Sequence, residues 1–310
     1  MMQNNKNTMP VDDLSFASRM EVYFNGGARR FIFYFAALFT GICIFAFPLG
    51  KLIMLSLDSE LYSFIPLIFA TSAYLLVTER KEIFDKPVFS PVYGALFLVL
   101  SLAAGAGGLA NAVSLSPNDY LCVMAFSFWL YVVGSFMLCF GVNIFMKALF
   151  PLGLLLFTVP FPDLILGRMV DFLQVASCDV TGWIFNALGF FPLREGFSFR
   201  FPEVSIEVAK QCSGIRSSTA LVILSLLCGD LFLRSCISRI LLVICSVFIA
   251  IFKNGVRIVV LTLGSIYVDP RILSSDLHRK GGIPIFIMAF AMLTSVVLIM
   301  RKLERLRKTS

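Results

Sequence analysis

Long apolar segments alternate with short polar segments along most of the chain. A membrane-spanning helix needs about 20 mostly apolar residues. The segments that meet this requirement lie at residues 31–50, 61–77, 88–109, 120–140, 144–160, 215–233, 240–268 and 283–300. The pattern therefore predicts an all-α polytopic membrane protein with about eight transmembrane helices.

The amino-acid composition requires a bilayer as solvent. Hydrophobic residues make up 58% of the 310 residues and charged residues 15%, against about 45–50% and about 25% in an average soluble domain. A soluble domain of this length has too little interior to bury that much apolar surface. The composition excludes an ordinary soluble enzyme, a disordered chain and a fibrous repeat, and it makes the lipid bilayer a partner of the chain.

The net charge of +7 first indicates orientation. If the N-terminus is cytoplasmic, the cytoplasmic loops and tails hold about twice as many Lys and Arg residues as the opposite side, as the positive-inside rule requires. No basic run with interleaved aromatic residues lies outside the apolar segments, so nucleic acid is not an expected partner. The predicted organisation is a cytoplasmic tail at 1–30, a single transmembrane domain at 31–300 with an outer-face segment at 161–214, and a basic cytoplasmic tail at 301–310.

The predicted outer-face segment contains two periodicities. Its first half, about 163–189, has polar positions at steps of three and four, which indicates a helix in the membrane interface or along a cavity. These positions are Asp163, Gly167, Asp171, Gln174 and Ser177. The second half alternates between apolar and polar residues over 197–201 and 204–208, with a turn near Pro202-Glu203. This period of two predicts a short β-hairpin that leads into Cys212.

Three residues that can do chemistry are predicted at the same outer boundary. Cys212 begins Cys212-Ser213-Gly214 at the mouth of the sixth span, Arg257 lies about 26 Å along the seventh, and His278 is in the last outer loop. A thiol near a helix N-terminus is stabilised as the nucleophilic thiolate, and an imidazole can move its proton. A guanidinium can stabilise an oxyanion, and Gly214 leaves room for a substrate.

Other interpretations of these residues stay open at this point. A lone cysteine at a span end acts as an inert small side chain, a lone histidine in a loop is solvated, and Arg257 can snorkel to the interface. In these structural interpretations, Asn254 hydrogen-bonds backbone groups of a broken helix, and Arg216 only anchors the sixth span. The alternative functions are a multi-pass transporter or channel, with Arg257, Lys253 and Asp230 along the solute path, and a non-catalytic envelope-assembly scaffold. With no CxxC pair and one histidine, a zinc site is not expected.

Three motifs resemble those of the exosortase/archaeosortase family. Residues 208–218, with the sequence VAKQCSGIRSS, look like the family's cysteine motif. Asn254-Gly255-Val256-Arg257-Ile258 matches its Asn-x-x-Arg motif, and His278 with Gly281-Gly282 resembles its histidine block. The order and spacing of the motifs and the eight-span layout agree with the family, and the similarity is strongest over 145–300.

The resemblance implies a membrane-embedded cysteine protease or transpeptidase of the cytoplasmic membrane, associated with exopolysaccharide production, that needs no cofactor and no metal. Its substrates are exported proteins with a C-terminal sorting signal, which consists of a Pro-containing motif, one hydrophobic span and a basic tail. By this resemblance, Cys212 forms a thioester at the motif, His278 moves the proton and Arg257 supports the oxyanion. An acceptor nucleophile, such as a lipid or glycan component, then releases the product at the outer face. The candidates for support of these residues or for substrate binding are Ser213, Gly214, Asn254, Glu207 and Arg216.

Overall fold

The computed structural model describes residues 27–84, 91–202, 205–269 and 282–309. His278 and most of the predicted tail at 1–30 lie outside the described residues. The contacts within the chain form two compact units, Met1–Asp163 and Leu164–Ser310. Two such units are compatible with one membrane domain, so the single domain at 31–300 stays a prediction.

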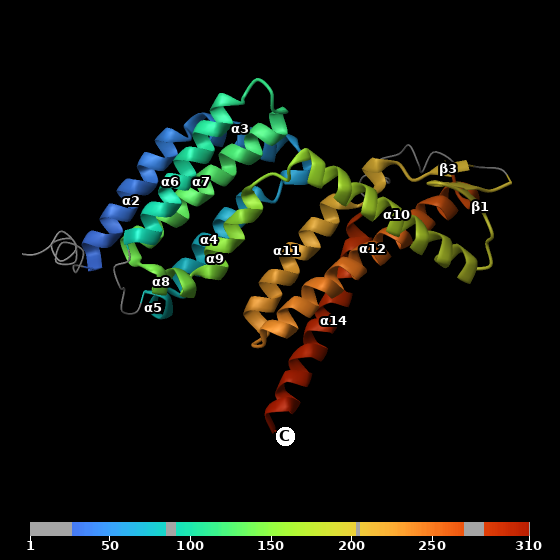
Figure 1. The fold of residues 1–310 in the computed structure, drawn as a ribbon. Coiled ribbons are helices and arrows are strands. Elements are labelled where there is room, and N and C mark those ends of the chain that lie inside the picture. The colour runs from blue at the N-terminus through green and yellow to red at the C-terminus, as the bar shows by residue number, and fades with distance from the viewer. Residues whose placement is uncertain (1–26, 85–90, 203–204, 270–281, 310) are drawn as a thin grey trace, which may run out of the picture. The chain divides into compact units, whose positions relative to one another are not determined.

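The described part of the first unit is helical (Figure 1). Its elements are α2 (Gly27–Ile44), α3 (Ala46–Asp58), η2 (Glu60–Tyr62), α4 (Ile65–Thr78), α5 (Arg80–Ile83), α6 (Pro91–Ala110), α7 (Pro117–Phe140), α8 (Val142–Lys147), α9 (Leu149–Leu154) and η3 (Leu155–Thr158). Helix α7 is buried along most of its length because α2, α3 and α6 all pack against it. Packed aromatic rings such as Phe136 and Phe140 fill part of this core.

Prolines explain why two of the predicted spans are not continuous helices. The first predicted span is bent by 79° between α2 and α3. Pro48 has no N–H to bond the carbonyl of Ile44 four residues earlier, and its ring displaces that carbonyl. The fifth predicted span is divided into α8, α9 and η3. Pro151 likewise has no N–H to bond the carbonyl of Lys147 four residues earlier, and α8 ends at Lys147.

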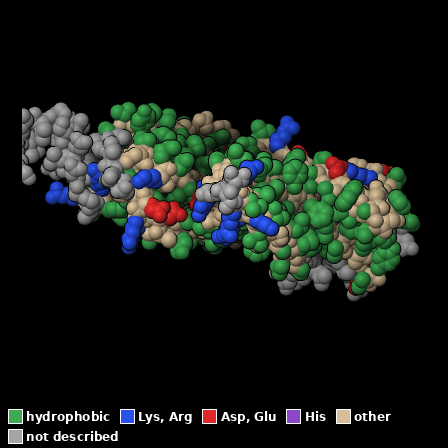
Figure 2. Space-filling model, turned by 90° about the horizontal axis from the view of Figure 1, so that it is seen from below, with side chains coloured by type: hydrophobic (Ala, Val, Ile, Leu, Met, Phe, Trp, Pro, Cys, Tyr) green, Lys and Arg blue, Asp and Glu red, His purple; other side chains and the backbone are tan. Residues whose placement is uncertain are grey.

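Six described helices are long and apolar enough to cross a membrane, and the total rises to eight if each of two bent pairs forms one span. The six are Glu60–Thr78, Pro91–Ala110, Pro117–Phe140, Ile215–Phe232, Cys236–Tyr267 and Pro284–Arg307. The bent pairs are Arg29–Ile44 with Ala46–Asp58, and Leu149–Thr158 with Asp163–Ala187. Hydrophobic side chains cover much of the surface in Figure 2, as contact with lipid requires. The predicted polytopic helical fold is therefore confirmed.

The second unit combines helices with a small sheet (Figure 1). Its elements are α10 (Asp163–Ala187), β1 (Leu193–Glu195), β2 (Ser198–Arg200), β3 (Ser205–Glu207), η4 (Lys210–Cys212), α11 (Ile215–Phe232), α12 (Cys236–Tyr267) and α14 (Gly282–Thr309). Helices α11, α12 and α14 pack against one another around a core that includes Leu221, Leu242 and Leu293.

The predicted β-hairpin is present as part of a three-stranded antiparallel sheet. Strands β2 and β3 pair with Phe199 opposite Ile206, which confirms the hairpin. Strand β1 adds a third strand along the other edge of β2. The alternation did not predict β1 because all three of its residues are exposed and show no period of two. The buried ring of Phe199 packs on Phe185 of α10 at 5.6 Å between ring centroids, which fixes the sheet on that helix.

The predicted stripe helix is confirmed as α10, and its two faces differ as expected. Large apolar side chains such as Leu164, Phe172 and Trp183 are exposed on it, as for a helix that faces lipid. Two residues of the polar stripe, Gln174 and Ser177, are buried instead. The stripe therefore brings polar groups from α10 into the interior of the second unit, next to Cys212.

Candidate active site

A short, hydrogen-bonded path leads from the sheet to Cys212. The N–H of Val208 donates to the carbonyl of Phe197 at 2.9 Å, and the buried amide of Gln174 donates to the carbonyl of Val208 at 2.6 Å. The N–H of Cys212 then donates to the carbonyl of Ala209 at 2.8 Å, which closes the turn of η4. The backbone around the cysteine is thereby fixed to both the sheet and α10.

Gly214 directs the chain from η4 into α11. Its φ of +76° lies in the left-handed region, which an L side chain adopts only at a cost. A Cβ at this position would lie 2.8 Å from the Cγ and Oδ1 atoms of Asn254, well inside van der Waals contact. Both the backbone conformation and the neighbouring side chain therefore require glycine here. The room for a substrate expected at Gly214 stays a prediction.

Asn254 joins three elements at the cysteine. Its Nδ2 donates to the carbonyl of Cys212 at 2.9 Å and to the hydroxyl of Ser177 at 3.0 Å. A carbonyl only accepts hydrogen bonds, so the contact with Cys212 fixes which end of the amide faces it. Asn254 is 1% exposed, and its Oδ1 has no hydrogen-bond partner among the described residues. The side chain connects α12 to η4 and α10, and it leaves one buried acceptor unused.

Cys212 and Arg257 line the same small cavity. Its volume is about 40 Å³, enough for about three water molecules by the volume that one water needs. The polar or reactive lining residues of this cavity are Glu207, Cys212, Asn254, Arg257 and Thr262. The apolar lining residues are Ile206, Val208, Ile258 and Leu261. A thiol and a guanidinium from elements 45 positions apart in the chain are thus brought to one largely apolar site.

The surroundings of the Cys212 thiol shift its pKa upward. Burial raises the pKa of Cys212 above its ordinary value, and the positive charge of Arg257 opposes this effect without reversing it. The direction is opposite to the one expected from a helix N-terminus. The physical reason is position: α11 begins at Ile215, beyond Gly214, so Cys212 lies before the helix while still being partly buried. A raised pKa favours the neutral thiol, which is a poorer nucleophile than the thiolate.

Lys253 adds a second buried cation near the site. It is 4% exposed and donates to the hydroxyl of Ser217 on the first turn of α11. It precedes Arg257 by four residues on α12, so the two cations lie on one side of the helix. Sequence reasoning considered Lys253 only as part of a solute path.

The predicted site residues fall into three groups. Those that line the cavity are Cys212, Arg257, Asn254 and Glu207. Ser213 and Gly214 are buried beside it, and Arg216 is exposed on the first turn of α11. His278 lies outside the described residues, so its place in the site stays a prediction. Gln174, Ser177, Ser217 and Lys253 were missed as site residues. The spacing of the α10 polar stripe contained the signal for Gln174 and Ser177.

Of the three residues proposed for a solute path, Asp230 does not lie with Lys253 and Arg257. Asp230 forms an ion pair with Arg239 at 2.8 Å, where α11 ends and α12 begins. Arg257 is 18 residues beyond Arg239 on α12, which corresponds to about 27 Å of helix. In the part of the chain that the structure describes, no group of three or more His, Cys, Asp or Glu residues is arranged to hold a metal ion.

The fold and the cavity together define a multi-pass membrane protein with a cysteine-containing site. The sequence model for the transmembrane exosortase (EpsH) family matches residues 54–295, and the chain belongs to this family. Searches of curated proteins and of solved structures returned no match. The match confirms the resemblance that the three motifs indicated, and it extends well into the first half of the chain.

Family membership determines the class of activity. Exosortases are membrane cysteine transpeptidases, so the chain is a membrane sorting transpeptidase whose substrates carry C-terminal sorting signals. The enzyme interpretation therefore replaces the transporter, channel and scaffold interpretations.

Proposed function

We propose that this chain cleaves the C-terminal sorting signal of exported proteins through a thioester at Cys212 and transfers them to an acceptor. The observation that carries the proposal is the cavity shared by Cys212 and Arg257, within the region that matches the exosortase family. A thiol beside a permanently charged guanidinium in a largely apolar site suits acyl transfer, because the guanidinium can stabilise the oxyanion where water is scarce.

The proposed reaction is an acyl transfer in two steps, acylation of Cys212 and release to an acceptor. The sulfur of Cys212 attacks the carbonyl carbon of the scissile peptide bond, and His278 accepts the thiol proton. Arg257 donates to the tetrahedral oxyanion. When the C–N bond breaks, His278 passes the proton to the amine of the leaving segment, and a thioester remains on Cys212. An acceptor amine or hydroxyl, on a lipid or glycan component, attacks the thioester carbonyl and restores the thiol.

The neighbouring residues receive supporting roles in this proposal. Asn254 is a positioning residue, since it holds the Cys212 carbonyl and touches the reacting atoms only through it. Glu207 lines the cavity and is exposed, so it is assigned to contact with the bound motif. The cavity holds only about three waters, too little room for a peptide segment. The scissile motif therefore binds across its mouth while the hydrophobic span of the signal stays in the bilayer.

The proposed active site lies at the outer face of the membrane. Helix α11 has 18 residues, about 27 Å at 1.5 Å per residue, close to the roughly 30 Å apolar core of a bilayer. Cys212 precedes this helix and Arg234 follows it. Arginine residues gather at the Arg234 end, around the start of α12 and the end of α14. The positive-inside rule assigns that end to the cytoplasm and Cys212 to the outside.

A cleavage assay with matched cysteine variants tests the proposed nucleophile. The full chain is co-expressed with an exported reporter that ends in a Pro-containing motif, a hydrophobic span and a basic tail. Cys212→Ala is expected to abolish processing, whereas Cys236→Ala, at an exposed cysteine, leaves it unchanged. Membrane insertion of both variants is measured in parallel. Undiminished cleavage by inserted Cys212→Ala protein refutes the assignment.

Thiol labelling tests the proposed orientation. Cys236 is exposed at the start of α12, at the end of the bundle opposite Cys212. In a variant that keeps only this cysteine, a membrane-impermeant maleimide is expected to label inverted vesicles and not intact cells. Labelling of intact cells contradicts the proposed orientation.

A further inference from the structure

A second cavity lies at the opposite end of the helix group from Cys212. It has a volume of about 940 Å³ and is formed by the α11–α12 connection, the first turn of α12 and the last turns of α14. Figure 2 views the molecule from the side on which α14 ends, and Lys and Arg side chains gather on that face. This cavity, called here the arginine cleft, is separate from the cavity at Cys212.

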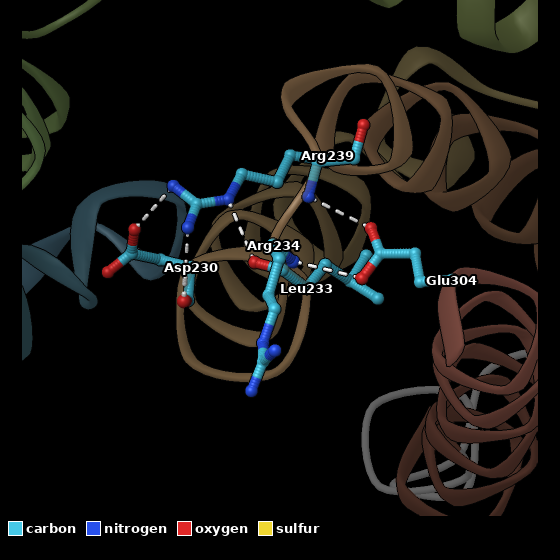
Figure 3. A network of polar contacts seen from close by, with 6 residues as sticks. Asp230, Leu233, Arg234, Arg239 and Glu304 are labelled. Atoms are coloured by element: carbon cyan, nitrogen blue, oxygen red, sulfur yellow. Dashed lines mark hydrogen bonds and ion pairs between the residues drawn. The ribbon is translucent and has the colours of Figure 1, made fainter. Parts of the chain in front are cut away.

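Both acidic residues of the arginine cleft are already engaged. Asp230 is paired with Arg239 at 2.8 Å. The two carboxylate oxygens of Glu304 accept the backbone N–H groups of Arg234 at 3.0 Å and Ser235 at 2.9 Å (Figure 3). These backbone groups precede α12 and would otherwise be without acceptors. Glu304 therefore holds α14 to the α11–α12 connection, and it also interacts with the Ser238 side chain and the charge of Arg234.

The remaining charges of the arginine cleft are positive. Three of its lining arginines make no ion pair among the described residues: Arg301, Arg305 and Arg307. The charge of a fourth, Arg234, interacts with Glu304. In Figure 3 the side chain of Arg234 extends away from the Glu304 carboxylate. Arg301 and Arg305 are four residues apart on one face of α14, where like charges repel. An anion bound between them removes this repulsion.

The arginine cleft lies at the level of lipid headgroups. The apolar part of α14 runs from Pro284 to Met300 and ends at Arg301. Seventeen residues of helix cover about 26 Å, close to the thickness of the apolar core. Arg301 is therefore at the membrane boundary, where phosphate groups are concentrated. Guanidinium groups bind phosphate through paired hydrogen bonds, and basic pockets between helices take anionic headgroups.

We propose that the arginine cleft binds a phosphate group, supplied by the headgroup of an anionic phospholipid. This binding proposal does not depend on Cys212, so the proposed transpeptidase function would stand even if the cleft bound no phosphate. The charge of the cleft also argues against one alternative occupant, the basic tail of a sorting signal: among the described residues, Arg301, Arg305 and Arg307 make no ion pair and both lining carboxylates are engaged.

Binding measurements on the purified full-length protein test this proposal. The probes are phosphatidylglycerol, phosphatidylcholine and inorganic phosphate, and binding is followed by native mass spectrometry. The test variant is Arg301→Gln/Arg305→Gln. The control is Arg80→Gln/Lys81→Gln, which removes two exposed positive charges from α5 in the other unit. Thermal unfolding of each variant shows that the protein remains folded.

The expected result is preferential binding of phosphatidylglycerol over phosphatidylcholine. The test variant should weaken this binding about 25-fold, since each basic residue near an anionic headgroup contributes about fivefold. The control variant should change it less than twofold. Displacement of the lipid by millimolar inorganic phosphate would identify free phosphate as the ligand and overturn the lipid assignment. Equal binding of both lipids, or equal losses in both variants, would overturn the site itself.

Discussion

The substitution Gly214→Ala separates backbone strain from steric conflict at the candidate site. A non-glycine residue in the left-handed region costs about 1–2 kcal/mol. The new Cβ would also lie 2.8 Å from Cγ and Oδ1 of Asn254. Asn254 is 1% exposed and bonded to Cys212 and Ser177, so it cannot rotate away without losing those hydrogen bonds. Each lost bond contributes about 0.5–1.5 kcal/mol.

The expected destabilisation by Gly214→Ala is therefore about 2–5 kcal/mol, the sum of the strain and the two lost bonds. The matched control is Gly189→Ala. Gly189 has a φ of +83°, and nothing lies within 4 Å of a Cβ built there. That variant carries the strain alone, about 1–2 kcal/mol.

A double-mutant cycle isolates the contact with Asn254. In an Asn254→Ala background, the atoms that meet the new Cβ are gone, so Gly214→Ala should cost only as much as Gly189→Ala does. The assay is unfolding of the purified protein in nanodiscs, together with the cleavage assay. If Gly214→Ala is no more destabilising than Gly189→Ala, the argument from the Asn254 contact is wrong.

Three further predictions follow from the site. Alkylation of Cys212 by iodoacetamide should increase with pH with an apparent pKa above the ordinary value of about 8.5, because burial raises the pKa and only the thiolate reacts. Arg257→Gln should raise that pKa further, and a midpoint below 8.5 contradicts the electrostatic argument. Arg257→Lys should lower kcat in the cleavage assay by about 10- to 100-fold, since lysine lacks the planar fork; near-normal turnover would remove Arg257 from the chemistry. Gln174→Leu should destabilise the protein by about 1–3 kcal/mol by leaving the Val208 carbonyl unpaired, whereas Asn186→Leu, at an exposed position of α10, should change stability by less than about 0.5 kcal/mol.

The sequence predicts those features of this protein that depend on local periodicity. The spacing of polar residues in 163–189 predicts α10, and the alternation around Phe199 and Ile206 predicts a hairpin that is present as β2 and β3. The same stripe contains Gln174 and Ser177, which the structure places in the interior. These features are predictable because residues close in sequence determine them.

Features that depend on contacts between distant segments could not be predicted in this way. The left-handed conformation of Gly214 and its contact with Asn254 join positions 40 residues apart, and nothing in either local pattern specifies their approach. The interruptions near Pro48 and Pro151 are a different case. The prolines were visible in the sequence, but a count of apolar residues does not register the hydrogen bond that each proline removes.

The protonation state of Cys212 connects these structural details to the proposed chemistry. Helix position alone predicts a thiolate, whereas the folded chain buries the sulfur and Arg257 offsets that burial only in part. A neutral thiol reacts slowly with alkylating agents and oxidants, because the thiolate is the reactive species. In the proposed mechanism, the sulfur becomes reactive when a base removes the proton while the scissile carbonyl is in place. In the proposed reaction a base creates the nucleophile, which is the role predicted for His278, and Arg257 is proposed to stabilise the charge that moves from sulfur to oxygen.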